Sequence, residues 1–197
     1  MSWMLLAALE AFAAPADAEP ESPPFGISLR GVAETWDDAS IGAVYRTGGF
    51  SSGAALLFPL PWDPVMVTVE ATYKRAGSGT SGTSHFEMLP ITILGEYALY
   101  RDGRGEVYAG LGPALMVFTE HHPDNGAGVL RGTRLGIETR VGGRFDTGLV
   151  NPTLPPAPQG LDRIELEVYA ARRFQRPGMP GFQLGAWRAG LGVVFRL

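Results

Sequence analysis

Apolar and polar positions alternate along this chain with a period of two from about residue 25 onward. The alternation recurs in segments separated by turn residues, which is the pattern of β-strands rather than of helices. It predicts eight strands, over 25–36, 51–60, 64–75, 85–100, 104–119, 127–146, 162–174 and 182–197. Most of them exceed the roughly five or six residues of an ordinary soluble strand. Residues 41–50 also alternate, so they either extend a neighbouring strand, which we prefer, or raise the count to ten.

The last predicted strand has the clearest division into two faces. One face is apolar throughout and consists of Trp187, Ala189, Leu191, Val193, Phe195 and Leu197. The other face consists of Arg188, Gly190, Gly192, Val194 and Arg196. The predicted strands over 25–36, 64–75, 127–146 and 162–174 repeat this division. The alternation alone allows two barrels, a membrane barrel with the charges inside and a soluble barrel with the apolar face inside.

Three features favour the membrane barrel. Glycines gather on the charged face, where a narrow lumen leaves little room: Gly110, Gly112, Gly136, Gly142, Gly190 and Gly192. That face mixes Arg with Glu and has little Lys, which suits desolvated bidentate ion pairs. Aromatic residues fall near the predicted strand ends, as at a membrane interface: Trp36, Trp62, Tyr73, Tyr100, Phe118 and Phe145.

The connections between the predicted strands alternate in length. Tight turns at 61–63 and 101–103 contrast with the longer connections, which lie at 37–50, 76–84, 120–126 and 175–181. Short turns on one rim and longer loops on the other are typical of bacterial outer-membrane barrels. We therefore predict an all-β fold, an eight-stranded antiparallel up-and-down transmembrane β-barrel over residues 25–197, with ten strands as the alternative. The Pro-rich connection over 147–161 is longer than this scheme explains.

The first residues differ from the rest of the chain. Met4 to Ala14 is an apolar run too short to cross a bilayer, and Ala16-Asp17-Ala18 supplies the small residues of a cleavage site. We expect a signal peptide over residues 1–18 and a short lead over 19–24. An amphipathic N-terminal helix is the alternative, because the start lacks Lys and Arg and Glu10 interrupts the run.

Composition excludes several classes of function. Cysteine is absent, which rules out disulfides, thiolate metal sites and cysteine catalysis. The net charge of −4 and the scattered Lys and Arg make nucleic acid an unsuitable partner. Glycine is abundant, with 27 residues, but 45% of the chain is hydrophobic, which fits a folded β protein with long turns.

Residues 84–119 resemble the central hairpin of the small OmpA/OmpW-like outer-membrane barrels. The matching positions in this hairpin are Leu89, Pro90, Tyr97, Tyr100, Tyr108, Gly110 and Gly112. The C-terminal strand is similar to the signal that the outer-membrane assembly machinery reads in this family, through Gly192, Phe195 and Leu197, although the family usually ends in Phe. The resemblance implies the outer membrane as location and a barrel geometry, and it carries no chemistry with it.

We expect the inward charges to converge, because eight strands enclose a lumen only wide enough for side chains. The predicted lumen network consists of Arg30, Glu34, Glu70, Glu96, Arg134, Glu138, Arg140, Glu165, Glu167 and Arg188. A gated polar path and a closed, ion-paired plug are the two interpretations. Buried charges are tolerated only when they are paired, so we favour the plug and expect no large pore.

The sequence indicates no metal, cofactor or catalytic site. Adjacent residues His121 and His122 cannot easily point at one ion, and no third ligand has the spacing of a metal motif. Ser84 and His85 invite a comparison with lipid-modifying barrel hydrolases, but no nucleophile, base and orienting residue stand at convincing positions.

Three functional hypotheses follow. The first is a non-enzymatic outer-membrane barrel that acts as a monomer through its surface loops or as a structural component, with lipid, lipopolysaccharide and the assembly machinery as partners. The second is an OmpW-like barrel that binds or passes small apolar molecules; an apolar upper lumen would support it, and the candidates are Val32, Ala55, Leu57, Pro59 and Met116. The third is a soluble periplasmic, lipocalin-like barrel.

Overall fold

The computed structural model describes residues 24–38, 45, 49–77, 84–122, 128–150, 159–175 and 183–197. Within these residues eight strands follow one another, and a helix of four residues, α3 (Thr147–Val150), follows the sixth. The strands are β1 (Gly26–Trp36), β2 (Gly49–Pro59), β3 (Val65–Gly77), β4 (His85–Asp102), β5 (Gly105–His122), β6 (Gly128–Asp146), β7 (Arg163–Gln175) and β8 (Ala186–Arg196). No helix in the described part of the chain is long and apolar enough to cross a membrane.

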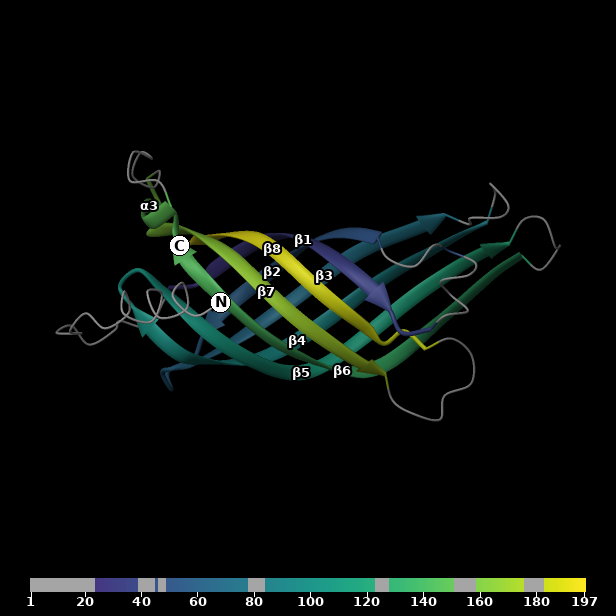
Figure 1. The fold of residues 1–197 in the computed structure, drawn as a ribbon, viewed down its shortest axis with the longest axis horizontal. Helices are drawn as coiled ribbons and strands as arrows, with labels where there is room; N and C mark the ends of the chain where they lie inside the picture. Colours follow the sequence, from purple (N-terminus) through teal and green to yellow (C-terminus); the bar gives the residue numbers. More distant parts are fainter. Residues whose placement is uncertain are drawn as a thin grey trace, which may run out of the picture.

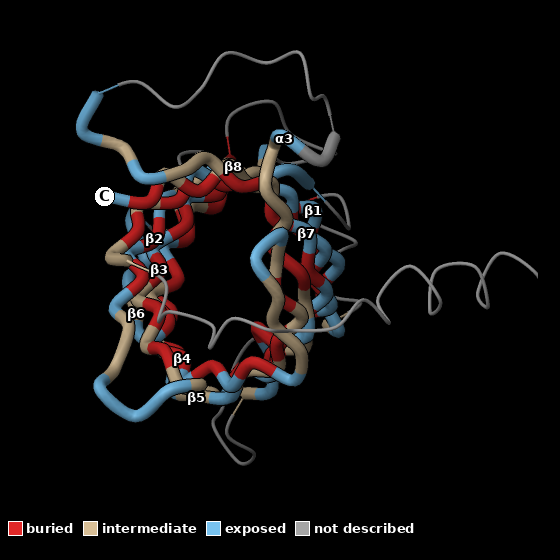
Figure 2. The backbone as a smooth tube through the Cα atoms, turned by 90° about the vertical axis from the view of Figure 1, so that its left-hand side faces the viewer, coloured by how far each residue is buried: buried red, intermediate tan, exposed pale blue. Residues whose placement is uncertain are grey.

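Each strand pairs antiparallel with the next, and β1 pairs with β8, so the sheet closes into a barrel (Figures 1 and 2). The closing register places Gly26 opposite Arg196 and Trp36 opposite Ala186. The prediction of an eight-stranded antiparallel up-and-down barrel is confirmed, and the ten-stranded alternative is wrong. Gly49 and Phe50 begin β2, whereas most of residues 41–48 lie outside the described residues.

The two rims of the barrel differ. At the turn end, residues 60–64 and 103–104 connect their strands tightly, and α3 and the C-terminus lie at the same end (Figure 1). At the opposite rim, the loop end, β1, β3, β5 and β7 finish. The strands β4, β5 and β6 have 18, 18 and 19 residues, which carries them further than the 11 residues of β1, β2 and β8.

Side chains alternate between the lumen and the outside along every strand. In β1, Ser28, Arg30 and Glu34 are buried, whereas Leu29 between them is 57% exposed. Figure 2, a view along the barrel, shows buried and exposed positions alternating around the ring. The soluble, lipocalin-like hypothesis required an apolar interior and a charged exterior. The structure has the reverse, so that hypothesis is wrong.

The aromatic residues divide between the two faces. Trp62 and Tyr73 are exposed and Phe145 is half-buried, as an outer aromatic belt would require. Trp36 and Phe118 are buried inside the barrel instead. The prediction that these two contribute to an outer belt is therefore wrong, because their even positions on β1 and β5 face the lumen.

The N-terminal segments predicted over residues 1–18 and 19–24 lie outside the described residues, apart from Pro24. The connection over 147–161 begins with α3, whose Thr147 side chain donates a hydrogen bond to the Ile164 carbonyl at 3.1 Å. Residues 151–158 of this connection also lie outside the described part.

Candidate functional site

Many charged side chains gather inside the barrel. Among the described residues, seven buried cations face the lumen: Arg30, Lys74, Arg140, Arg144, Arg173, Arg188 and Arg196. Eight buried carboxylates accompany them: Glu34, Glu70, Glu96, Glu106, Glu120, Glu138, Glu165 and Glu167. The two charges nearly balance, as burial in a narrow lumen requires.

Two carboxylates form the centre of this network. Glu70 on β3 pairs with Arg30, with Arg140 at 2.7 Å and with Arg188 at 2.9 Å. Glu138 on β6 pairs with Arg140 at 2.8 Å, with Arg188 at 2.7 Å and with Arg173 at 3.1 Å. Arg140 and Arg188 each bridge both carboxylates, because a planar guanidinium can donate in two directions. The four side chains come from three strands and tie β3, β6 and β8 together across the lumen.

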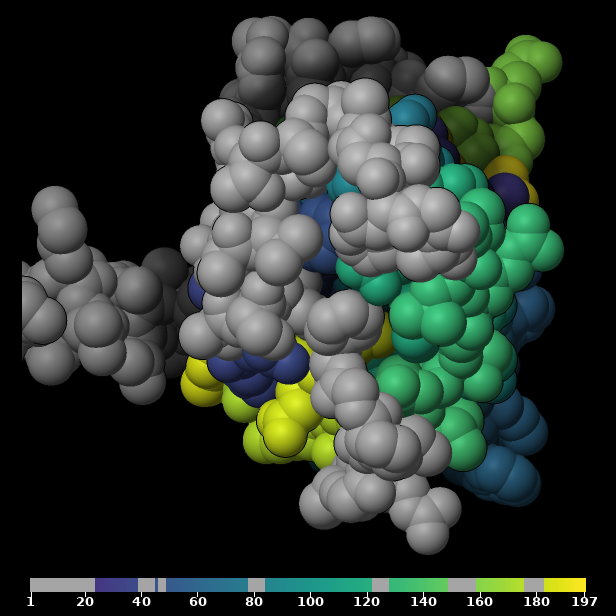
Figure 3. Space-filling view, turned by 90° about the vertical axis from the view of Figure 1, so that its right-hand side faces the viewer, coloured from purple at the N-terminus to yellow at the C-terminus, as the bar shows by residue number. Residues whose placement is uncertain are grey.

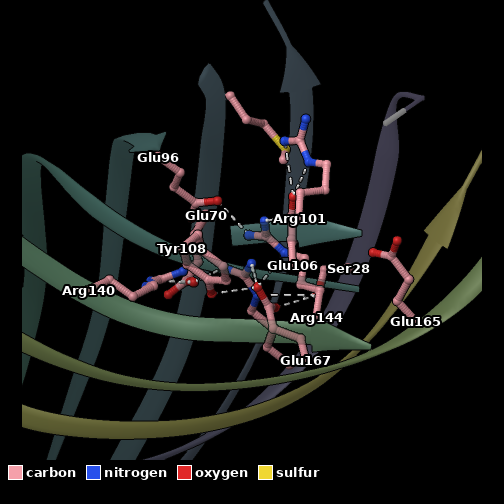
Figure 4. Close-up of polar contacts among 12 residues, drawn as sticks. Ser28, Glu70, Glu96, Arg101, Glu106, Tyr108, Arg140, Arg144, Glu165 and Glu167 are labelled. Carbon is pink, nitrogen blue, oxygen red and sulfur yellow. Dashed lines mark hydrogen bonds and ion pairs between the residues drawn. The ribbon is translucent and has the colours of Figure 1, made fainter. Parts of the chain in front are cut away.

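A second group surrounds Glu167 on β7 (Figure 4). Arg30 donates to both of its oxygens at 2.7 and 2.9 Å, Arg144 donates at 3.0 Å, and the Tyr108 hydroxyl donates at 2.8 Å. Arg144 also pairs with Glu96 at 2.5 Å and with Glu106 at 2.6 Å. Its guanidinium lies 4.0 Å from the centre of the Tyr108 ring, so the cation is held by three carboxylates and an aromatic face.

The network continues to the turn end. Glu106 pairs with Arg101 at 3.1 Å and with Arg196 at 3.5 Å. Arg196 in turn pairs with Glu165 at 2.9 Å. At the other side of the centre, Arg173 pairs with Glu34 at 3.1 Å. Ion pairs therefore run without a break along the lumen from the turn end to Glu34, and we call this set of residues the charge column.

At the loop end, which faces the viewer in Figure 3, the lumen contains a group of apolar side chains instead of ion pairs. It consists of Trp36, Tyr45, Phe86, Met88, Met116, Phe118, Leu184 and Ala186, all buried, and we call it the apolar cluster. The Phe86 ring contacts three other rings of the cluster, with centroids 5.6 to 5.8 Å apart. Lys74 marks the boundary: its ammonium lies 4.0 Å from the Trp36 ring centre and 4.0 Å from Glu34.

Tyr45 belongs to the connection between β1 and β2, and its side chain reaches the cluster. The hydroxyl donates a hydrogen bond to the Glu120 carboxylate of β5. Burial raises the pKa of the Tyr45 hydroxyl, and the contact with Glu120 raises it further. The phenol therefore stays protonated at neutral pH and serves as a donor at this end of the lumen.

The structure places nine of the ten predicted lumen residues in one connected network of ion pairs. They are Arg30, Glu34, Glu70, Glu96, Glu138, Arg140, Glu165, Glu167 and Arg188, with Glu34, Glu96 and Glu165 joined through other arginines. Arg134, the tenth, lies on the lumen side of β6 nearer the loop end. Its guanidinium lies 5.4 Å from the Phe118 ring centre and donates to the Thr133 carbonyl at 3.1 Å.

The prediction missed five buried members of the column. These are Lys74, Glu106, Arg144, Arg173 and Arg196. Four of them, Lys74, Arg144, Arg173 and Arg196, share strand parity with a predicted residue of the same strand, so the alternation could have found them: Arg144 and Arg140 lie on one face of β6, for instance. Glu106 lies on β5, for which no network residue was predicted. What the alternation could not show is that Arg144 would meet three carboxylates from three other strands.

The predicted apolar upper lumen is partly wrong. Met116 belongs to the apolar cluster, but Ala55 and Leu57 pack with Met66 and Val194 near the turn end. Val32 packs with Tyr169 and Ala171 in a third group. Pro59 ends β2 at the turn end as well. Strand β2 runs from the loop end to the turn end, so its last inward residues cannot reach the upper lumen.

No family model and no curated protein matches the chain. Several solved structures do match the chain. The structure of Neisserial surface protein A matches with a TM-score of 0.62 and 12% identity, covering 88% of this chain and 97% of that one. The chain has the fold of eight-stranded outer-membrane β-barrels.

Two structures from Pseudomonas aeruginosa share this fold. The N-terminal β-barrel domain of OprF matches with a TM-score of 0.52 and 14% identity over 87% of this chain and 97% of that chain. The outer membrane protein OprG matches with a TM-score of 0.53 and 12% identity over 92% and 99%. This agrees with the OmpA/OmpW-like resemblance of the hairpin that β4 and β5 form.

Proposed function

We propose that this protein spans a bacterial outer membrane as a closed barrel and acts there through its loop end or as a structural component, without enzymatic activity. The observation that carries the proposal is the distribution of side chains, with charged residues inside the barrel and apolar residues outside. Large apolar side chains cover the outside, among them Leu29, Ile93, Leu111, Ile137, Val141 and Leu191, each between 47% and 67% exposed. An exposed apolar surface of this extent is unfavourable in water and suits a hydrocarbon environment.

Location and barrel closure can be tested together. Fractionation of the expressing cells should recover the protein in the outer-membrane fraction, and the unheated protein should migrate differently from the boiled protein on a gel. Release into the soluble periplasm without detergent would contradict the proposal. With an even number of strands both chain ends lie on the periplasmic side, so the loop end would face outward, towards lipopolysaccharide.

The charge column supports a closed lumen. Each carboxylate of the charge column meets at least one guanidinium, and a path for ions would have to separate these pairs without water to replace them. Purified protein in a planar bilayer should therefore show no conductance steps in the nanosiemens range. Regular steps of that size would show that the column opens.

The last strand is proposed to serve as the assembly signal. Phe195 and Leu197 lie on the outer face of the barrel, and Gly192 faces the lumen with Arg30 and Ser28 beside it. The Leu197 amide donates to the Phe25 carbonyl at 2.9 Å, which fastens the two chain ends of the barrel together. Phe195→Ala should slow insertion by the assembly machinery, whereas Phe174→Ala, on the same outer face of β7, should not. Equal insertion rates of Phe195→Ala and the parent would oppose this role.

A second candidate function is the binding of small apolar molecules at the loop end. The apolar cluster supports it, because it places aromatic and Met side chains inside the barrel next to the rim. Energy transfer from tryptophan to an apolar fluorophore, measured in lipid nanodiscs, tests it. Transfer should fall in Trp36→Phe and persist in Trp187→Phe, whose side chain is 63% exposed on the outer face. If transfer depended on Trp187 alone, the fluorophore would be dissolved in the surrounding lipid and not bound inside the barrel.

A further inference from the structure

Two histidines that lie far apart in the sequence are neighbours on the outer face of the barrel. His85, the first residue of β4, is the direct cross-strand partner of His121 near the end of β5. Their imidazole rings stack with centroids 4.2 Å apart and 14° between the planes. Glu87 lies two residues after His85, so it presents its carboxylate on the same face.

The three side chains gather their ligand atoms closely. One nitrogen of each imidazole and one carboxylate oxygen all lie within 4.8 Å of one another. The His85 Nε2 atom is 3.7 Å from the Glu87 Oε1 atom. Ligands of a tetrahedral Zn²⁺ ion, bound at about 2.0–2.1 Å, lie roughly 3.3 Å apart, so small rotations of these side chains bring them to that geometry.

The surroundings hold Glu87 in place and leave access for an ion. The Tyr73 hydroxyl on β3 donates a hydrogen bond to Glu87, as a supporting residue around a metal site commonly does. The side chains of His85 and Glu87 are 24% and 30% exposed, so water can occupy the remaining coordination positions. Arg75, whose Nε atom is 3.7 Å from Glu87, is the competing cation, and its side chain is 59% exposed.

We propose that His85, Glu87 and His121 bind a divalent transition-metal ion, with Zn²⁺ as the reference ion, at the loop end of β4 and β5. Two imidazoles and a carboxylate are the donor set that Zn²⁺ and its neighbours in the first transition row accept. The ion would join the two strands where they leave the barrel. The site lies outside the lumen, so it is separate from the charge column and from the proposed membrane role.

Metal binding by the purified, untagged full-length protein tests the proposal. The chain has three histidines and no cysteine, so a polyhistidine tag must be removed and no thiolate can contribute. In calorimetry, one Zn²⁺ ion should bind per protein molecule. Co²⁺ in the same site should give an absorption band in the visible range, as expected for coordination by nitrogen and oxygen ligands in a low-symmetry geometry. Zn²⁺ should also raise the thermal midpoint of the barrel, because it binds only the folded register.

Four variants separate this site from adventitious binding. His85→Ala and His121→Ala should each weaken Zn²⁺ binding at least about tenfold, while Arg75→Ala should strengthen it by removing the competing cation. His122→Ala, which removes the remaining histidine, should bind as the parent does. Gel migration of the unheated variants establishes that each one folds. Failure of the parent to bind Zn²⁺, or binding that is unchanged in folded His85→Ala, would overturn the proposal.

Discussion

The charge column and the apolar cluster occupy the same lumen but are built by different means. In the column, each of the two central carboxylates meets three guanidiniums, so every contact has a direction and a partner. In the cluster, rings and thioethers pack without directional bonds, apart from the contact between Tyr45 and Glu120. The column can exist only in one register of the strands, whereas the cluster can adjust to a change in shape.

This difference indicates that the two parts of the lumen stabilise the barrel in different ways. The column crosses the lumen between strands that are not neighbours in the sheet, such as β3 with β8 and β1 with β7, and so fixes the cross-section. The cluster packs inside the loop end and consists of residues that other apolar residues could replace. Mutations in the column should therefore be more damaging than mutations in the cluster, and contacts on the outer rim should matter least.

The largest effect is expected from Glu70→Gln. The amide keeps the size of the side chain but leaves Arg30, Arg140 and Arg188 with one carboxylate fewer between them. Breaking a buried ion pair costs about 3–5 kcal/mol, so the free energy of unfolding should fall by about 3 kcal/mol. Urea unfolding in lipid vesicles measures it.

Asp162→Asn is the matched control for this variant. Asp162 is 58% exposed and lies 3.7 Å from Arg163, so its neutralisation should change stability by less than about 0.5 kcal/mol. If Glu70→Gln proved as mild as this surface variant, the column would not be what fixes the barrel.

A smaller loss in the free energy of unfolding is expected from Gly190→Ala. A Cβ atom at Gly190 would lie 2.2 Å from the Tyr169 ring, which in turn stacks on Arg140 with 4.2 Å between ring centre and guanidinium. The ring must shift, which disturbs its contact with Arg140, and overpacking of this kind costs about 1–3 kcal/mol. The control is Gly95→Ala on the outer face of β4, where the nearest atom is 3.8 Å away. Equal stability of the two variants would show that Tyr169 has room to move.

The apolar cluster should tolerate change better. Phe86→Leu removes part of a ring that contacts Trp36, Tyr45 and Phe118, and the free energy of unfolding should drop by about 1 kcal/mol because the neighbours can close the gap. Phe58→Leu, on the outer face at 39% exposure, should change stability by less than about half as much. A loss as large as that of Glu70→Gln would remove the distinction between the two parts of the lumen.

The smallest effect is expected on the outer rim from Arg172→Lys. Arg172 pairs with both oxygens of Asp37 at 2.6 Å and lies between the Phe174 and Trp187 rings. Lysine keeps the charge but loses the second hydrogen bond, so about 0.5 kcal/mol should be lost. The stability difference between variant and parent should shrink at high salt, since the pair is partly exposed. A difference that does not respond to salt would point to ring packing instead of charge.

Strand parity determined much of this protein from the sequence alone. The alternation in β8, with Trp187 and Leu191 on one face and Arg188 and Arg196 on the other, fixed which side chains enter the lumen, because successive residues of a strand must point to opposite faces. The strand count followed from the turn residues between the segments. These are local properties, and a single strand contains all the information they need.

Only the tertiary structure decided which side chains meet. The meeting of Arg144 with Glu96, Glu106 and Glu167, the position of Leu57 near the turn end and the pairing of His85 with His121 all depend on register and on the tilt of strands around a closed ring. Register is a property of two strands together, and closure is a property of all eight. The sequence determined the two faces of each strand, and the closed barrel determined the partners of each residue on them.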